Sequence, residues 1–193
     1  PRLLRMLERQ SVPASFFIPA VSHLLHPQMV ESILSYDIHE IGVHGWIHEL
    51  LPLLDDRGEE QRLLDQAIDT LTTAIGKRPV GYRAPSWQFS NYTVEQIKDA
   101  GFLYDSSLMA SDDAYEILID GEPSGVVELP IERILDDFPY FGGNTNGSLP
   151  VPELMIKVFR SEFDVAWEEG GLFVLTMHPH IMGHRSRVAA LEG

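Results

Sequence analysis

The chain contains no cysteine among its 193 residues, so disulfide bonds and thiolate metal ligands are both excluded. Basic residues are scarce: 14 lysines and arginines stand against 29 aspartates and glutamates, which gives a formal net charge of −15. Nucleic acids and anionic lipid surfaces are bound through basic patches, so neither is expected as a partner. No apolar run approaches the ~20 residues that a membrane-spanning helix needs, and no transmembrane segment is expected.

The two ends of the chain also lack familiar features. The chain begins at Pro1 without an initiator methionine or a signal-peptide pattern, and residues 188–193 resemble the beginning of a helix. We therefore expect residues 1–193 to be a single domain that is truncated at both ends. A cytoplasmic location is slightly favoured, a signal peptide lost upstream stays an alternative, and a homo-oligomer is compatible with the sequence.

Short apolar segments alternate with amphipathic segments along the chain. Helices are predicted at residues 1–10, 27–35, 59–75, 93–100 and 152–169, and strands at 14–18, 38–43, 80–82, 102–104, 126–129 and 172–177. Residues 110–125 are predicted to form an acidic loop, and residues 131–149 to be irregular. This alternation is typical of one α/β domain whose parallel sheet is covered on its faces or closed into a barrel.

A pair of histidines follows the predicted strand over residues 38–43. His44 and His48 are four positions apart, and Gly45 between them lets the backbone bend. Two imidazoles at this spacing can converge on one cation, and neutral imidazole is a common ligand of zinc. A bare pair of this kind also has a structural interpretation, in which one ring is a hydrogen-bonded core residue and the other is solvated.

Other polar side chains follow other predicted strands. Arg83, Asp105 and His178 come after the strands at residues 80–82, 102–104 and 172–177. Because the loops that follow parallel strands gather at one edge of the sheet, we expect these side chains to share that edge with the histidine pair. Taken singly, each has a structural alternative: an ion pair for the arginine, a turn or helix cap for the aspartate, and a backbone hydrogen bond for the histidine.

Two acidic pairs receive a separate interpretation. Asp112 with Asp113, and Asp136 with Asp137, are predicted to be solvated. Asp137 is the one candidate for a cleft among them, because Pro-Tyr-Phe follows it closely.

Six segments together resemble the NodB-homology polysaccharide deacetylases, carbohydrate esterase family 4. The similarity is greatest to the branch that contains peptidoglycan deacetylase-like proteins, cyclic imide hydrolases and allantoinases. The segments cover nearly the whole chain in the order of the family: residues 14–19, 39–49, 81–87, 101–109, 128–130 and 172–179. The resemblance implies a deformed (β/α) barrel, with its first strand and its last elements outside this chain.

The resemblance also implies roles for individual residues. His44 and His48 hold a divalent metal, zinc in the first place, with cobalt, nickel or iron as alternatives. Arg83 orients the catalytic carboxylate, and His178 is the general acid. Asp105 is a looser match for the carboxylate that tunes a histidine. The residues predicted to contact substrate are Trp87, Trp46 and Tyr82.

One motif of the family has no counterpart in this chain. The Asp pair or Asp-x-Asp that supplies the base and a third metal ligand belongs upstream of the first helix, and no aspartate precedes Pro13. Either that motif lies outside this chain or the base has been lost.

Three functions therefore stay open. The first is a metal-dependent hydrolase of non-peptide carbon–nitrogen bonds that deacetylates amino sugars in a glycan such as peptidoglycan or chitin. The second is a hydrolase of small cyclic amides, of the cyclic imide or allantoin type. The third is a sugar-binding module without catalytic activity.

Overall fold

The computed structural model describes residues 2–143 and 151–193, and these fall into two compact units. The first, which we call the sheet unit, comprises Pro13–Leu108 and Ala114–Leu129. The second, the helical unit, comprises Pro1–Val12, Met109–Asp113 and Pro130–Gly193. That residues 1–193 form a single domain stays a prediction. In the described part of the chain, no helix combines the length and the apolar character that a bilayer crossing requires.

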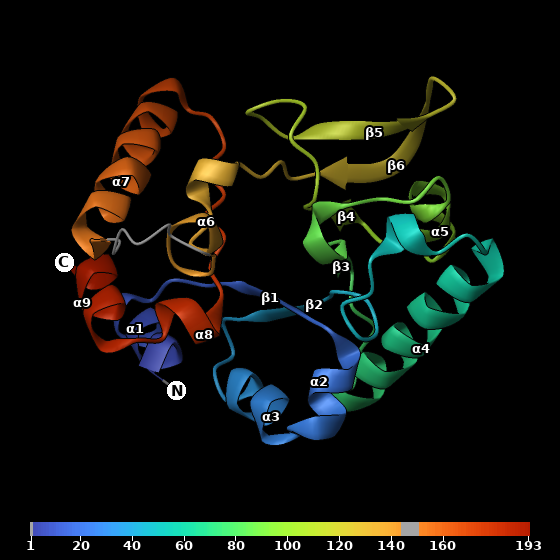
Figure 1. Ribbon diagram of the computed structural model, residues 1–193, viewed down its shortest axis with the longest axis horizontal. Coiled ribbons are helices and arrows are strands. Elements are labelled where there is room, and N and C mark those ends of the chain that lie inside the picture. Colours follow the sequence, from blue (N-terminus) through green and yellow to red (C-terminus); the bar gives the residue numbers. More distant parts are fainter. Residues whose placement is uncertain (1, 144–150) are drawn as a thin grey trace. The chain divides into compact units, whose positions relative to one another are not determined.

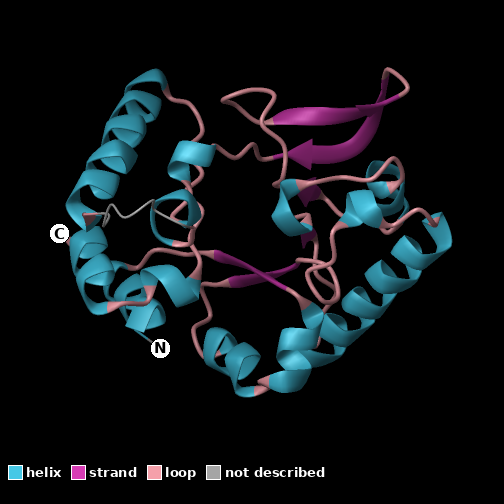
Figure 2. Ribbon diagram, in the orientation of Figure 1, coloured by secondary structure: helices cyan, strands magenta, loops and turns pink. Residues whose placement is uncertain are grey.

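The sheet unit is built on six strands in the order β1-β2-β3-β4-β6-β5 (Figures 1 and 2). Neighbouring strands are parallel from β1 to β6, and β5 is antiparallel to β6. The predicted α/β class with a parallel sheet is confirmed. The strands are β1 (Ser15–Ile18), β2 (Glu40–Val43), β3 (Gly81–Tyr82), β4 (Tyr104–Asp105), β5 (Tyr115–Ile119) and β6 (Glu122–Glu128).

Helices connect the parallel strands of this unit: α2 (Ala20–Leu25), α3 (Gln28–Leu34), α4 (Arg57–Ile75) and α5 (Thr93–Asp99). Helix α4 packs against β2, α2 and α3 (Figure 1). Asp56 caps its first turn by accepting a hydrogen bond from the N–H of Gly58 at 2.8 Å, and Gly76 ends it at a left-handed φ of 80°. Its buried side chains recur at helical spacing, namely Leu63, Leu64, Ala67, Ile68 and Leu71.

Two glycines allow close packing within the sheet. A Cβ atom on Gly42 would lie 2.7 Å from the ring of Phe17 and 2.9 Å from the carbonyl oxygen of Gly81. A Cβ atom on Gly81 would overlap the ring of Tyr104. The hydroxyl of that tyrosine donates to Glu40 at 2.7 Å, so the ring is held over β3. Neither glycine can be replaced without moving an aromatic side chain.

Strands β5 and β6 form a hairpin where the sequence analysis predicts an acidic loop, so that prediction was wrong over most of its length. Asp120 and Gly121 form the turn, with φ angles of 52° and 86°. An Asp-Gly pair is favoured in a two-residue hairpin turn because both central residues need positive φ. Along β6, Ser124, Val126 and Glu128 are buried and alternate with exposed residues. Because Ser124 and Glu128 are polar although buried, the sequence does not show the alternation of apolar and polar residues that predicts a strand.

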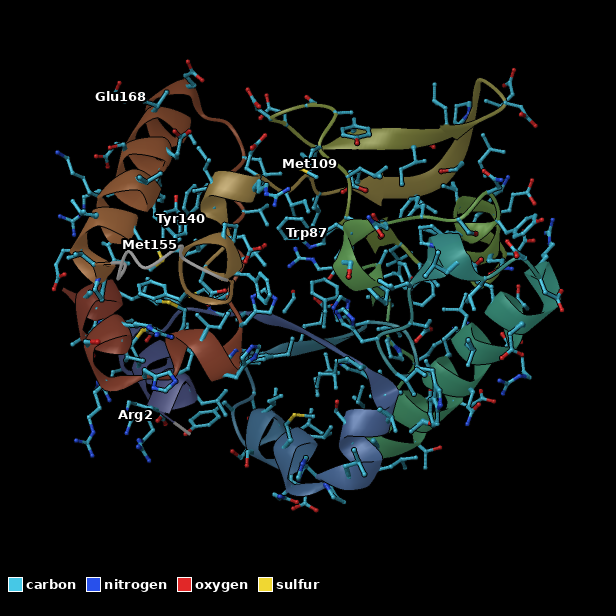
Figure 3. All side chains as sticks on the ribbon, viewed as in Figure 1. Arg2, Trp87, Met109, Tyr140, Met155 and Glu168 are labelled. Atoms are coloured by element: carbon cyan, nitrogen blue, oxygen red, sulfur yellow. The ribbon has the colours of Figure 1, made fainter. Side chains whose placement is uncertain are left out.

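The helical unit comprises α1 (Arg2–Gln10), a short 3-10 turn η3 (Arg133–Leu135), α6 (Phe138–Phe141), α7 (Pro152–Glu169), α8 (Pro179–Met182) and α9 (Arg185–Glu192). Helix α9 packs against both α1 and α7. Met155, labelled in Figure 3, is buried on α7 with Phe159, and both pack with Leu135 and Met182. The α7 helix predicted at residues 152–169 is confirmed, with Gly170 as its left-handed C-cap.

Residues 172–177 do not form the predicted strand. Their pairing is a single parallel bridge, in which Thr176 donates its N–H to Leu135 at 2.8 Å and accepts from the N–H of Asp137 at 3.3 Å. An apolar run needs a continuous neighbour to build a ladder, and η3 and α6 turn away after this one bridge. In the segment predicted to be irregular, residues 144–150 lie outside the described residues.

Candidate functional site

The carboxyl ends of β2, β3 and β4 place their next residues along one edge of the sheet unit. The N–H of His44 donates to the last residue of β1 at 3.2 Å, and the N–H of Arg83 donates to the last residue of β2 at 2.9 Å. In the same way, Ser106 donates to the last residue of β3 at 3.0 Å. Each bond continues the parallel ladder by one residue. The structure therefore brings the histidine pair, Arg83 and the end of β4 together, as the sequence predicts for this unit.

The rings of His44 and His48 lie next to each other, with centroids 4.9 Å apart and planes at 79°. Nδ1 of His44 is 2.7 Å from the carbonyl oxygen of Arg83. Because a carbonyl only accepts, Nδ1 carries the proton, and the lone pair of the neutral ring is on Nε2. Histidines that bind metals in proteins usually donate their other ring N–H in this way. Nε2 of His44 is therefore the ring nitrogen suited to a divalent cation, and the adjoining ring of His48 is the second candidate ligand.

Glu49 organises the loop that carries both histidines. Its two carboxylate oxygens each accept the N–H of Trp46 at 3.0 Å, and one also accepts the N–H of Ile47 at 2.8 Å. A Cβ atom on Gly45, whose φ is 70°, would lie 2.8 Å from that carboxylate. His48 itself has a φ of 64°, a left-handed conformation that is uncommon for a residue other than glycine. The loop is thus held in one conformation by a carboxylate clasp.

The guanidinium of Arg83 is held at the same edge. Its Nε donates to the carbonyl of Ser106 at 2.7 Å, and Nη2 donates to the hydroxyl of Ser106 at 2.6 Å. That hydroxyl donates to the carbonyl of Leu129 at 2.8 Å, and the guanidinium carbon lies 4.6 Å from the ring centroid of Phe17. These contacts fix the arginine and the backbone that follows β4.

Asp105 is fully buried beside Glu128, its register partner on β6. Burial, reinforced by the adjoining Glu128 carboxyl, raises the pKa of Asp105 well above its ordinary value. Asp105 accepts a hydrogen bond from the hydroxyl of Ser107 at 2.8 Å. Glu128 accepts the N–H groups of Ser107 and Leu108, each at 2.9 Å. The sequence analysis missed Glu128; its signal is an acid at an inward position of an alternating strand.

The three aromatic candidates differ in exposure. Trp87, labelled in Figure 3, is half-buried and has a φ of 58°, directly after Ser86 with a φ of 56°. Trp46 is also half-buried. Tyr82 is 2% exposed, and its ring packs on Phe102 with centroids 5.5 Å apart. Tyr82 is therefore a core residue, whereas the side chains of Trp46 and Trp87 are partly exposed.

In the helical unit, the side chain of His178 contacts two adjacent aspartates, Asp136 and Asp137. Its Nδ1 lies 2.7 Å from Asp137 and 3.4 Å from Asp136, and its backbone N–H donates to Asp137 at 2.9 Å. Both aspartates are buried, so the prediction that they are solvated was wrong. The segment from η3 to α6 turns both carboxyl groups inward. The available signal was the apolar flanks of the pair, Leu135 and Phe138.

This contact changes the acidity of the imidazole. The hydrogen bonds to Asp136 and Asp137 raise the pKa of His178 to about 9, against the opposing effect of burial. Burial raises the pKa of Asp137, and the hydrogen bonds from His178 oppose that rise. Ligand atoms of these three residues lie within 4.8 Å of one another, so they could also hold a cation. When no cation is bound, a pKa of about 9 keeps the imidazole of His178 mainly protonated at neutral pH.

Comparisons with known proteins agree with these features. The family model described as polysaccharide deacetylase matches residues 1–104, more than half of the chain. A peptidoglycan deacetylase of Helicobacter pylori is 30% identical over 210 residues, an alignment that covers 94% of this chain and 71% of that protein. The chain belongs to the polysaccharide deacetylase family. It is thus related to hydrolases, and the predicted family and enzyme class are confirmed.

Solved structures of other proteins share the fold. A candidate polysaccharide deacetylase from Mycobacterium smegmatis superposes with a TM-score of 0.89 at 37% identity, covering 100% of this chain and 67% of that chain. An allantoinase superposes with a TM-score of 0.83 at 24% identity, covering 99% of this chain and 63% of that chain, which shows a common fold alone. The chain is shorter than both of these neighbours.

Proposed function

We propose that this polysaccharide deacetylase homologue holds a divalent cation with His44 and His48 and removes acetyl groups from amino sugars of peptidoglycan. The observation that carries the proposal is the bond from Nδ1 of His44 to the Arg83 carbonyl, which puts the lone pair of the ring on Nε2. Family membership supports deacetylation, and the Helicobacter pylori relative supports peptidoglycan as the polymer. Zinc is the proposed ion, and cobalt, nickel and iron suit the same ligands.

The proposed roles follow from the chemistry of amide hydrolysis. A divalent ion supplies Lewis acidity, which polarises the amide carbonyl and makes water easier to deprotonate. The amine leaving group must be protonated as the carbon–nitrogen bond breaks, and His178 is the proposed acid. Its pairing with Asp137 keeps the imidazole charged at neutral pH. Arg83 is proposed to orient a carboxylate, and Trp46 and Trp87 to contact the sugar.

Metal binding is tested by His44→Ala and His48→Ala. Each variant should lose both the bound metal, measured by elemental analysis, and the release of acetate from N-acetylglucosamine oligomers. His26→Ala is the matched control, because His26 is an exposed histidine at the end of α2. Full turnover by His44→Ala would contradict the proposal.

The substrate class is tested by offering acetylated glycan and small cyclic amides in parallel. Acetate release from peptidoglycan fragments supports the proposal. Ring opening of succinimide or allantoin without acetate release would assign the site to the cyclic amide hydrolases instead. Sugar binding by calorimetry without any product would identify a non-catalytic module, and either of these two results contradicts deacetylation.

A further inference from the structure

One peptide group lies between the histidine pair and the interior of the sheet unit. The carbonyl of Arg83 accepts the Nδ1–H of His44 at 2.7 Å, and the N–H of the same peptide, on Ala84, donates to the hydroxyl of Ser107 at 2.8 Å. Ala84 and Ser107 are both fully buried. The orientation of this peptide therefore decides whether Nδ1 of His44 faces the carbonyl, which accepts a hydrogen bond, or the N–H, which donates one.

The hydroxyl of Ser107 links this peptide to Asp105 by hydrogen bonds. Its oxygen accepts from Ala84, and its hydrogen goes to Oδ1 of Asp105 at 2.8 Å. All donors point in the same direction, from the imidazole through the peptide and the hydroxyl to the acid. Hydrogen bonds in such a chain polarise one another, particularly in a buried setting. A change at Asp105 can therefore reach His44 without any direct contact.

The chain ends on two buried acids that face each other. Oδ2 of Asp105 and Oε2 of Glu128 find no hydrogen-bond donor among the described groups, although both side chains are fully buried. Two adjacent carboxylates cannot both be ionised in such a site, and one proton between these two oxygens satisfies both. Oε1 of Glu128 already accepts two backbone N–H groups, and burial raises the pKa of Asp105 well above its ordinary value, so the proton is assigned to Asp105.

The other groups around the pair agree with this arrangement. The guanidinium of Arg83 lowers the pKa of Asp105. Its effect is smaller than that of burial and of Glu128, which both raise this pKa. The buried hydroxyl of Tyr82 stays protonated, since burial and then Asp105 raise its pKa. The two acids together therefore hold one proton, which Asp105 donates to Glu128.

We propose that Asp105, Glu128 and Ser107 are positioning residues for His44. The proton shared by the two acids anchors a hydrogen-bond chain that holds the Arg83–Ala84 peptide and fixes the Nδ1–H tautomer of His44. The lone pair of the ring is then on Nε2, the nitrogen proposed to bind the cation. This inference rests on the proposed function for its purpose. It differs from the role that the family resemblance gives Asp105, because it acts on His44 through a serine and a peptide.

The test breaks the chain at its middle and compares two changes at its end. Ser107→Ala removes the link between the peptide and the acids. Asp105→Ala removes the anchor, whereas Asp105→Asn keeps it, because an amide accepts from Ser107 and donates to Glu128 as the protonated acid does. Ser124→Ala is the matched control: Ser124 is a buried serine whose hydroxyl also accepts one backbone N–H, in the β5–β6 hairpin.

Two measurements are made on each variant. Nitrogen NMR of the metal-free protein reports which ring nitrogen of His44 is protonated, and competition with a chromophoric chelator gives the affinity for zinc. Ser107→Ala and Asp105→Ala should lower the Nδ1–H fraction and weaken zinc binding by about 10- to 100-fold, as the loss of an outer partner of a metal ligand typically does. Asp105→Asn and Ser124→Ala should behave like the unmodified protein.

An unchanged tautomer and an unchanged zinc affinity in Ser107→Ala would overturn the proposal. If Asp105→Asn lowers the Nδ1–H fraction of His44 and the zinc affinity as much as Asp105→Ala does, the proposal of a proton between Asp105 and Glu128 is overturned. If Ser107→Ala does not fold, Ser107→Cys, a weaker donor and acceptor, should give an intermediate loss, and full affinity in that variant is the contrary result. If the unmodified protein binds no zinc, the proposed function fails, while the tautomer of His44 still decides this inference.

Discussion

The carboxylate of Asp137 holds His178 at two points. Oδ1 lies 2.7 Å from Nδ1 of the ring, and Oδ2 accepts the backbone N–H at 2.9 Å. With Asp136, the first contact raises the pKa of the ring, and the second contact holds the backbone of His178 to the same carboxylate. Nδ1 is committed to the carboxylate, so Nε2–H is the group with which His178 can act as an acid.

The first prediction concerns the alkaline limit of activity. If His178 is the general acid, kcat/KM for acetate release should fall with a midpoint near its pKa of about 9. Asp137→Asn removes the closer anionic partner, so the midpoint should move down toward the ordinary histidine pKa of 6.5. The pH dependence of kcat/KM measures both. Asp112→Asn, at an exposed acid, is the control, and coincident profiles for the two variants would argue against the pairing.

A second prediction concerns stability rather than rate. The pKa of His178 is higher in the folded chain than its ordinary value of 6.5, so folding is stabilised while the ring is protonated. This contribution is complete below pH 6.5 and is lost as the pH rises through about 9. Urea unfolding should therefore show His178→Gln at its greatest disadvantage in mildly acidic solution. The disadvantage should shrink above pH 9, and a gap that does not vary with pH would contradict the ion pair.

Strand-end chemistry was predictable from the sequence because it depends on local features. The apolar run over residues 38–43 predicts β2, and the register of parallel strands then places His44 beside Arg83. The tautomer of His44 was not predictable, since it depends on a carbonyl that lies 39 positions along the chain. The pairing of Asp105 with Glu128 was hidden for the same reason, because it depends on which strand neighbours β4.

Two errors had a common physical origin, because polarity was equated with exposure. Residues 110–125 carry enough polar side chains to suggest a loop, yet most of them belong to the β5–β6 hairpin, with Asp120 and Gly121 at its turn. Asp136 and Asp137 read as solvated acids, yet both are buried against His178. A buried carboxylate is stable when it is paired, and its partner here is distant in sequence.

A third prediction concerns the carboxylate clasp at the histidine loop. Glu49→Ala leaves the N–H groups of Trp46 and Ile47 without their acceptor, so the loop should loosen. We expect zinc affinity to fall by about 10- to 100-fold, as for other losses of support around a metal ligand. The free energy of unfolding should fall by only about 1 kcal/mol, because water can reach the loop.

Chelator competition and urea unfolding measure these two effects of Glu49→Ala separately. Asp55→Ala is the control, since it removes the same charge from an exposed position in the neighbouring loop. Equal zinc affinities in the two variants would show that the clasp does not support the histidines.

The last prediction tests the close packing beneath the site. In Gly81→Ala the new methyl group would overlap the ring of Tyr104, which is tethered to Glu40 and cannot move without losing that bond. Overpacking of this kind typically costs about 1–3 kcal/mol in unfolding free energy, measurable by urea denaturation. Gly143→Ala is the control, because no atom of the described residues lies within 4 Å of its added Cβ. Since Gly81 is two residues before Arg83, its shift should also disturb the carbonyl that receives His44 and weaken zinc binding. Equal stability of the two alanine variants would show that the sheet relaxes around β3 without strain.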